Sequence, residues 1–301
     1  MISEAEYKQR RERIVKYLKP NSIAILTSAK HQIRSNDTEY RFRQNSNFYY
    51  LCGFKEDNSA LVFVKDKKKS KIYLFVEKKN KQKELWNGKR AGIKKARKKF
   101  EVDDVFEFKK FKKLLAKFSK NKRYIYFDAM REKADTKIYA KTLKKTPKQK
   151  DLSYKLKKMR SIKSDAEIKL IKKALSITKK AHKEARKQAK TLKYEYEIQA
   201  IFEYIFRKNG ANDEAYSTIA ASGDNANTLH YIKNSKKLNH KDLILIDAGC
   251  EFKYYASDIT RVFPLSGKFS KPQKEIYNLV LKTQKKIISM IKAGVLRSQL
   301  Q

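Results

Sequence analysis

The stretch LILIDAGCEFKYYASDITRVFP, residues 243–264, decides the fold of the second half of this chain. Two apolar segments rich in β-branched residues, 243–246 and 259–263, flank a turn-like middle and predict a buried antiparallel strand pair. Asp247 follows the first segment and Asp258 precedes the second. Buried carboxylates are costly unless they are paired, hydrogen-bonded or metal-bound, and two that face one point repel each other. The stretch therefore predicts a site for a hard divalent cation such as Mn²⁺ or Mg²⁺.

Each acid taken alone has a simpler interpretation, because a single aspartate at a strand end is most often a turn former or a cap. The pair, however, follows a known pattern. Asp-Ala-Gly, eight residues and then Asp-Ile-Thr-Arg resembles the first metal-ligand segment of the M24, or pita-bread, metallopeptidases. The resemblance implies two divalent ions, manganese being expected, with Asp247 as a ligand of one ion and Asp258 as a bridge between both.

Two further runs resemble the aminopeptidase P branch of that family. Residues 40–54, YRFRQNSNFYYLCGF, match the signature of aminopeptidase P N-terminal domains almost residue for residue. Residues 267–281, GKFSKPQKEIYNLVL, are similar to the segment that follows the first metal ligands in this branch. The resemblance implies an α/β (α+β) protein, with an N-terminal α/β aminopeptidase P domain followed by the first part of a pita-bread catalytic domain.

Two more side chains acquire expected roles through the resemblance. His230 lies in the run SGDNANTLHY, and a lone loop histidine would otherwise be interpreted as structural. The resemblance makes His230 the catalytic, substrate-binding histidine, which donates a hydrogen bond to the substrate or to a developing oxyanion. Trp86 is the only tryptophan, and a lone tryptophan is usually a core residue. In the family the matching tryptophan reaches towards a neighbouring subunit's active-site mouth, so Trp86 is a substrate-side candidate.

The formal charge of +42 on 301 residues suggests a nucleic acid or an anionic surface as a partner. The basic residues are nevertheless spread along most of the chain, and lysine far outnumbers arginine. Arginine is the better reader of bases and phosphates. We therefore expect no specific nucleic-acid partner, only salt-sensitive adhesion to polyanions.

The N-terminal run MISEAEYKQRRERI is charged and has no apolar region of the kind found in secretory signals. No apolar run approaches the roughly 20 residues that a membrane helix requires, so no membrane partner is expected. Cys52 and Cys250 fall in different predicted domains and have no metal-type spacing. We expect two buried, reduced thiols in a cytoplasmic protein.

Strands alternate with helices in the first half, which predicts an α/β domain over residues 1–147. The strands are expected at 23–27, 59–64, 71–76, 105–108 and 123–127, and the helices at 3–18, 93–100, 111–118 and 137–145. The polar residues 148–163 are predicted to be a linker. The partial catalytic domain is expected over residues 164–301.

Amphipathic helices open and close this second domain. The helix that begins at Ser164 is expected to bury one face formed by Ile168, Ile171, Leu175 and Ile177–Thr178. His182 is expected on the helix surface or in contact with the dipole at the C-terminal end of the helix. A second helix is expected over 193–208. A long helix after Pro272 has an apolar stripe formed by Ile276, Leu279, Val280, Ile287, Ile288 and Ile291.

The resemblance also predicts what residues 1–301 do not contain. In the family, a histidine and two glutamates complete the set of five metal ligands, and they lie in a later part of the chain. No histidine follows His240 here. We expect a truncated chain that supplies two of the ligands and lacks activity, with an open apolar face that favours aggregation or oligomerisation.

The function implied by the resemblance is that of an Xaa-Pro aminopeptidase. Such an enzyme releases the N-terminal residue from peptides with proline in second place, and the family likeness suggests a homo-oligomer. The nearest alternative is a prolidase, which cleaves Xaa-Pro dipeptides. An alternative of another class is a non-catalytic, M24-like binding module.

Overall fold

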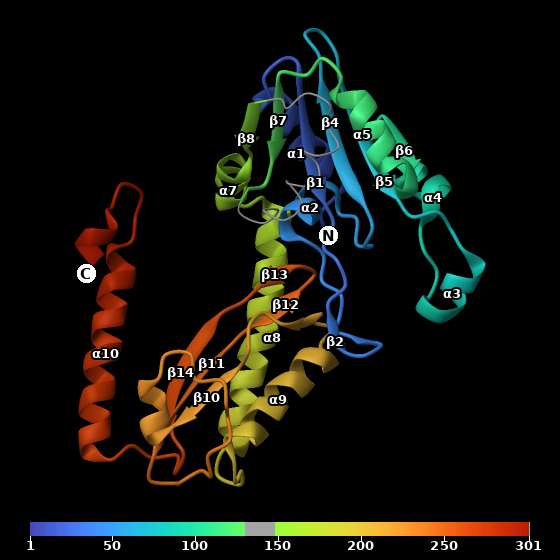
Figure 1. Ribbon diagram of the computed structural model, residues 1–301. Coiled ribbons are helices and arrows are strands. Elements are labelled where there is room, and N and C mark those ends of the chain that lie inside the picture. Colours follow the sequence, from blue (N-terminus) through green and yellow to red (C-terminus); the bar gives the residue numbers. More distant parts are fainter. Residues whose placement is uncertain (130–147, 301) are drawn as a thin grey trace. The chain divides into compact units, whose positions relative to one another are not determined.

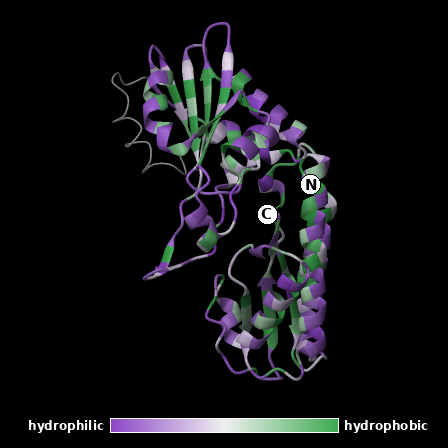
Figure 2. Ribbon diagram, turned by 90° about the vertical axis from the view of Figure 1, so that its right-hand side faces the viewer, coloured by the Kyte–Doolittle hydropathy of each residue, from purple (hydrophilic) through white to green (hydrophobic). Residues whose placement is uncertain are grey.

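The computed structural model of the protein describes residues 1–129 and 148–300. The chain divides into two compact units, Met1–Ala166 and Glu167–Gln301. In both units the strands carry many of the hydrophobic residues, whereas the connecting loops are largely hydrophilic (Figure 2). Among the described residues, no helix is both long enough and apolar enough to cross a lipid bilayer.

The first unit is built on a six-stranded mixed sheet with the order β6-β5-β4-β1-β7-β8 (Figure 1). The pairs β1–β4 and β4–β5 are antiparallel, and the pairs β1–β7, β5–β6 and β7–β8 are parallel. The strands are β1 (Ser22–Thr27), β4 (Ala60–Lys65), β5 (Ser70–Val76), β6 (Asp104–Glu107), β7 (Tyr124–Phe127) and β8 (Lys148–Asp151). The α/β class predicted for this half is confirmed.

Side chains alternate along β1, so the strand contributes to a hydrophobic core on each face of the sheet. Ala24 and Leu26 belong to the first core, and Ile23 and Ile25 belong to the second. The first core receives side chains from α1 (Glu4–Tyr17), α2 (Ser46–Cys52) and α4 (Gly92–Lys99), and the second from α5 (Phe111–Ser119). The remaining elements before β7 are β2 (Ile33–Ser35), β3 (Thr38–Glu39), α3 (Lys81–Asn87) and the 3₁₀ turn Phe108–Lys110.

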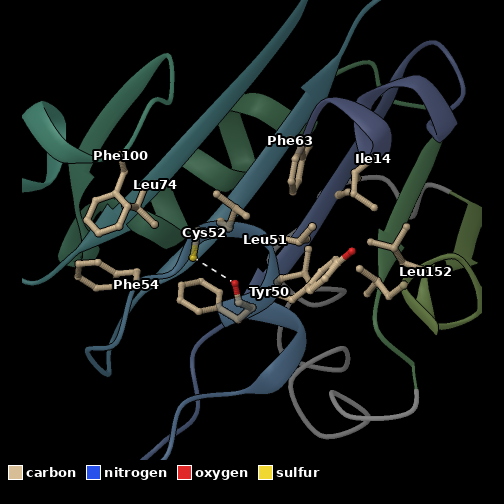
Figure 3. Packing of buried hydrophobic residues seen from close by; sticks show 14 of the residues in the cluster. Ile14, Tyr50, Leu51, Cys52, Phe54, Phe63, Leu74, Phe100 and Leu152 are labelled. Carbon is tan, nitrogen blue, oxygen red and sulfur yellow. Dashed lines mark hydrogen bonds between the residues drawn. The ribbon is translucent and has the colours of Figure 1, made fainter. Parts of the chain in front are cut away.

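Aromatic rings fill much of the first core. Phe54 and Phe100 meet edge to face with their ring centroids 5.3 Å apart (Figure 3). The buried Cys52 lies in the same cluster, and its thiol donates to the Phe48 carbonyl oxygen at 3.1 Å. Burial raises the pKa of Cys52 to about 12, so this thiol is inert at neutral pH. Cys250 is likewise a free, buried cysteine, as expected for both.

The predicted linker at residues 148–163 is wrong, because this stretch is regular structure that belongs to the first unit. β8 pairs in parallel with β7, and α7 (Ser153–Ser161) follows it directly. Leu152, Leu156 and Met159 are buried in the first core, at a spacing that places them on one face of the helix. Abundant lysines on the other faces hid this apolar stripe in the sequence. The helix predicted at 137–145, like the predicted domain boundary at 147, lies outside the described residues.

The second unit packs two helices against a three-stranded antiparallel sheet with the order β10-β11-β14 (Figure 1). The helices are α8 (Asp165–Gln188) and α9 (Glu195–Lys208), and the strands are β10 (Ile219–Ser222), β11 (Leu243–Ala248) and β14 (Ile259–Pro264). A smaller sheet contains β9 (Asp213–Glu214), β12 (Cys250–Phe252) and β13 (Tyr255–Ala256). The strand pair predicted from residues 243–264 is confirmed, with Asp247 opposite Thr260.

The last long element is α10 (Lys271–Met290), which begins with a capping box. The Ser270 hydroxyl accepts from the Gln273 amide, the Gln273 side chain reaches back to the Ser270 amide, and Pro272 lies in the first turn. None of its residues is buried. The predicted apolar stripe is present but open to solvent, and Ile276, Leu279 and Val280 are each more than 60% exposed.

Candidate active site

The two aspartates of the opening motif meet at one tyrosine hydroxyl. Asp247 lies near the end of β11, and Asp258 immediately precedes β14. The Tyr216 hydroxyl contacts Oδ1 of Asp247 and lies 3.0 Å from Oδ1 of Asp258. A phenol carries one proton, so it can donate to only one carboxylate at a time. The tyrosine therefore holds two acids together without neutralising either charge.

The carboxylates are more exposed than the sequence predicted. Burial alternates along β11: Ile244, Ile246 and Ala248 pack into the core with α8 and α9, whereas Leu243, Leu245 and Asp247 are only partly buried. Asp258 is exposed. The prediction that both acids are buried is wrong, because the described residues cover only one face of this sheet.

Tyr216 stays protonated in this environment. Burial raises its pKa, and the hydrogen bonds and charges of Asp247 and Asp258 raise the pKa further. Both effects oppose formation of a phenolate. Sequence reasoning missed Tyr216, since the run EAYSTIA contains no motif of its own. Its position became visible only through the pairing of β10 with β11, which sets Ile219 opposite Asp247.

The loop between the two aspartates is held by close backbone packing. A Cβ atom on Gly249 would lie 1.8 Å from the Ser257 carbonyl oxygen, so glycine is required at this point of the motif. The Ser257 hydroxyl lies 2.7 Å from the Thr178 hydroxyl on α8 and accepts from the Cys250 amide at 3.0 Å. These contacts fix the register of Asp258 relative to Asp247.

The donor set fits part of a metal site. Two carboxylates that share one hydroxyl are hard oxygen donors, and a cation between them would relieve their repulsion. Over residues 1–129 and 148–300, no group of three or more His, Cys, Asp or Glu side chains could hold a metal ion. Among the described residues, no third such side chain joins Asp247 and Asp258 to complete a metal site.

His230 lies in a loop that begins at the carboxyl end of β10 and is organised by Glu195. The loop includes a 3₁₀ turn, Gly223–Asn227, and His230 follows it with its ring exposed. Glu195, the first residue of α9, accepts hydrogen bonds from Ser222, Asn225, Tyr231 and Lys236. No hydrogen bond or ion pair joins His230 to Asp247 or Asp258 in the described structure.

Two family models match this chain, one in each half. Residues 7–126 match "Aminopeptidase P, N-terminal domain", and residues 169–301 match "Metallopeptidase family M24". The Xaa-Pro aminopeptidase of Haemophilus influenzae is 38% identical over 293 residues, which cover 97% of this chain and 68% of that protein. The Escherichia coli Xaa-Pro aminopeptidase is 34% identical, with 97% and 69% covered.

Solved structures agree with the sequence matches. A structure of E. coli aminopeptidase P with the inhibitor Pro-Leu has a TM-score of 0.91 at 34% identity, over 95% of this chain and 68% of that one. A proline aminopeptidase from Yersinia pestis has a TM-score of 0.94 at 32% identity, over 99% and 71%. This chain belongs to the aminopeptidase P family. It is therefore a member of the M24 metalloaminopeptidases, as the motif at residues 243–264 predicted.

Trp86 is not the core residue that a lone tryptophan usually is. It lies on α3 of the aminopeptidase P domain, and its side chain is 82% exposed. The neighbouring Leu85 is equally open. Two large apolar side chains therefore lie open to solvent on a helix with no buried residue.

His182 was expected on the surface of its helix or in contact with the helix dipole, and the surface position is wrong. The ring is buried, packs edge-on against Phe202 at 4.8 Å and places Nε2 2.9 Å from the Ile259 carbonyl oxygen. Nδ1 is buried and has no hydrogen-bond partner among the described atoms. Burial lowers the pKa of His182. The residue is a neutral donor that ties α8 to the start of β14, next to Asp258.

Proposed function

We propose that the function of this chain is that of an Xaa-Pro aminopeptidase. Such an enzyme releases the N-terminal residue from peptides with proline in second place. One observation carries the proposal: Asp247 and Asp258 converge on a single hydroxyl within the segment that matches the M24 metallopeptidase model. Relatives named Xaa-Pro aminopeptidase, at 38% and 34% identity, support the substrate class.

Asp247 and Asp258 would contribute carboxylate ligands to two divalent metal ions, manganese being the expected metal. When bound, such ions polarise the scissile carbonyl and make a nucleophile available at neutral pH. Tyr216 keeps its proton and orients the two carboxylates. These roles use only the hard oxygen donors that the geometry brings together.

His230 would act on the peptide bound by its own chain, and Trp86, by the family resemblance, on the peptide bound by a neighbouring subunit. The exposed imidazole of His230 would donate a hydrogen bond to the substrate or to a developing oxyanion, a type of contact worth roughly 3 kcal/mol. The open ring of Trp86 offers a flat apolar surface suited to a proline-containing peptide.

We propose further that residues 1–301 alone hydrolyse peptides slowly or not at all. Affinity for a divalent ion depends on the number and charge of its ligands, and the described residues bring together only two carboxylates. The H. influenzae relative has about a third of its length outside the match, because this chain covers 68% of it. That unmatched part is where a relative can carry further ligands.

The test compares two proteins on an Xaa-Pro-Xaa tripeptide with added Mn²⁺. One is the 301-residue chain, and the other is a hybrid that adds the segment of the H. influenzae relative that lies outside the match. We expect manganese-dependent release of the first residue by the hybrid and none by the 301-residue chain. In the hybrid, Asp247→Asn should abolish turnover, whereas Asp224→Asn, at an exposed aspartate of the same unit, should not.

Each outcome decides one point. Robust manganese-dependent turnover by the 301-residue chain would overturn the proposal that its site is incomplete. A hybrid that cleaves only Xaa-Pro dipeptides would identify a prolidase. A folded hybrid that binds manganese but cleaves neither peptide would favour a non-catalytic binding module.

A further inference from the structure

Glu195 is a fully buried carboxylate at the start of α9 whose partners all come from one loop segment. Oε1 accepts from the Ser222 amide and hydroxyl, both at 2.8 Å, and from the Asn225 side chain at 3.0 Å. Oε2 accepts from the Tyr231 hydroxyl at 2.7 Å and the Lys236 amide at 2.9 Å. All of these donors lie within residues 222–236, the segment that contains His230.

The charge on Glu195 is stable despite its burial. Burial by itself would raise the pKa of the carboxyl, but hydrogen bonds from Ser222, Asn225, Tyr231 and Lys236 outweigh it, and the net pKa is lowered. The position at the first turn of a helix also favours a negative charge. A buried carboxylate is stable only while its hydrogen-bond donors stay in place. The ordered loop and the ionised form of Glu195 therefore stabilise each other.

A second anchor fixes the end of the loop independently of Glu195. Asn234 has a positive φ of 46°, accepts from the Ala220 amide at 3.0 Å and donates to the Thr218 carbonyl oxygen at 2.7 Å. This anchor ties the loop end to β10 but does not reach His230. The Tyr231–Glu195 hydrogen bond is made by the residue next to His230 in the chain.

We propose that Glu195 is a positioning residue that sets the conformation of residues 222–236 and, through Tyr231, the orientation of His230 towards the peptide. This inference rests on the proposed function for the role of His230. Glu195 lies outside the sequence motifs, and its proposed role concerns the geometry of the loop rather than the metal ligands.

The test uses the 301-residue chain and three variants. Glu195→Gln removes the charge, Tyr231→Phe removes only the bond beside His230, and Glu197→Gln is the matched control. Glu197 lies in the same first turn of α9, and its carboxylate accepts from the Tyr194 amide, not from the loop. Hydrogen exchange reports on the loop amides, and ¹³C-histidine NMR reports on the His230 ring.

We expect exchange within residues 223–235 to rise by about tenfold or more in Glu195→Gln and to stay unchanged in Glu197→Gln. Tyr231→Phe should shift the His230 ring signal while the His240 signal and the thermal midpoint hold, an effect that a purely structural role would not produce. Loop amides that remain protected in Glu195→Gln, or a His230 signal unmoved in Tyr231→Phe, would overturn the proposal. Neither readout requires peptide hydrolysis, so failure of the proposed function shows separately in the tripeptide assay.

Discussion

Gly249 shows how strictly one position of the aspartate motif is constrained. A methyl group there would meet the Ser257 carbonyl oxygen at 1.8 Å, and this oxygen belongs to backbone that cannot rotate away. We expect Gly249→Ala to lower the free energy of unfolding by roughly 3 kcal/mol, because overpacking forces the backbone to shift. Urea denaturation followed by circular dichroism measures the loss.

Gly210→Ala is the control for this prediction. Gly210 has a positive φ of 78°, but a methyl group there would meet no atom of the described residues within 4 Å, its chain neighbours aside. The only expected cost is therefore that of a non-glycine residue in the left-handed backbone region, about 1 kcal/mol. If Gly249→Ala destabilised the protein no more than Gly210→Ala does, the close approach of Ser257 would not constrain the motif.

His182 makes the stability of the second unit depend on pH. Burial lowers its pKa from the ordinary value of 6.5, so the unfolded chain binds more protons in the window just below 6.5. The stabilisation that the buried, neutral His182 ring contributes is complete above pH 6.5. It is lost as the pH falls towards the folded-state pKa of His182. We expect His182→Gln to lessen the drop in unfolding free energy between about pH 7 and 5.5. The exposed His240, changed to Gln, should leave the wild-type slope intact, and an equal drop in both variants would refute the assignment.

At this scale the motif residues were predictable, and their supporting residues were not. Asp247 and Asp258 stand in a spacing that is visible in one dimension. Tyr216 and Glu195 carry no such spacing, and they reach the site only because β10 pairs with β11 and because α9 begins beside the loop. A contact between residues 31 positions apart, such as Tyr216 and Asp247, is set by topology rather than by local pattern.

Among the elements, α7 is the clearest departure from the predicted organisation. A linker would tolerate truncation of Leu156, but the side chain is fully buried in the first core. We expect Leu156→Ala to cost about 3 kcal/mol of unfolding free energy, as large-to-small core changes do. Lys157→Ala, at the adjacent exposed position, should be nearly neutral. Equal midpoints for both variants in urea denaturation would restore the linker interpretation.

The buried face of α8 also differs from the prediction, for a related reason. The apolar positions expected inside include Ile168 and Leu175, which are more than a third exposed. Of the predicted positions Ile177 is buried, and the helix otherwise buries Leu170, Ala174, Ala181 and Ala185. Alanine is a weak hydrophobic signal in sequence, yet small residues permit the close approach of a helix to its neighbours. Element positions were thus predictable from periodicity, but which face turned inwards was decided by packing.

For the molecule as a whole, the open stripe of α10 predicts self-association. Ile276, Leu279 and Val280 lie together on a helix with no buried residue. At roughly 0.3 M NaCl, which screens the net charge of +42, we expect sedimentation velocity to show concentration-dependent association. The double change Leu279→Gln and Val280→Gln should reduce the association, and Lys282→Gln should not. A monomer at all concentrations would contradict the prediction.

The net charge itself should act through polyanions without sequence selection. We expect the chain to bind duplex DNA of any sequence at low salt and to lose that binding steeply by about 0.2 M salt, as counterion release requires. Fluorescence anisotropy with two unrelated duplexes measures both properties. Binding that persisted at that salt and preferred one duplex would instead support a dedicated nucleic-acid function.

The sequence by itself determined the family, the α/β class, the strand pair at residues 243–264 and its two aspartates, because these depend on local spacing and on periodicity. Only the tertiary structure decided that α7 joins the first core, that Asp258 is exposed, that His182 is buried, that Tyr216 contacts both aspartates, and that Glu195 accepts hydrogen bonds from the loop that contains His230. These features depend on contacts between residues far apart in the chain. Such contacts follow from which surfaces pack together, and one-dimensional patterns do not record that choice.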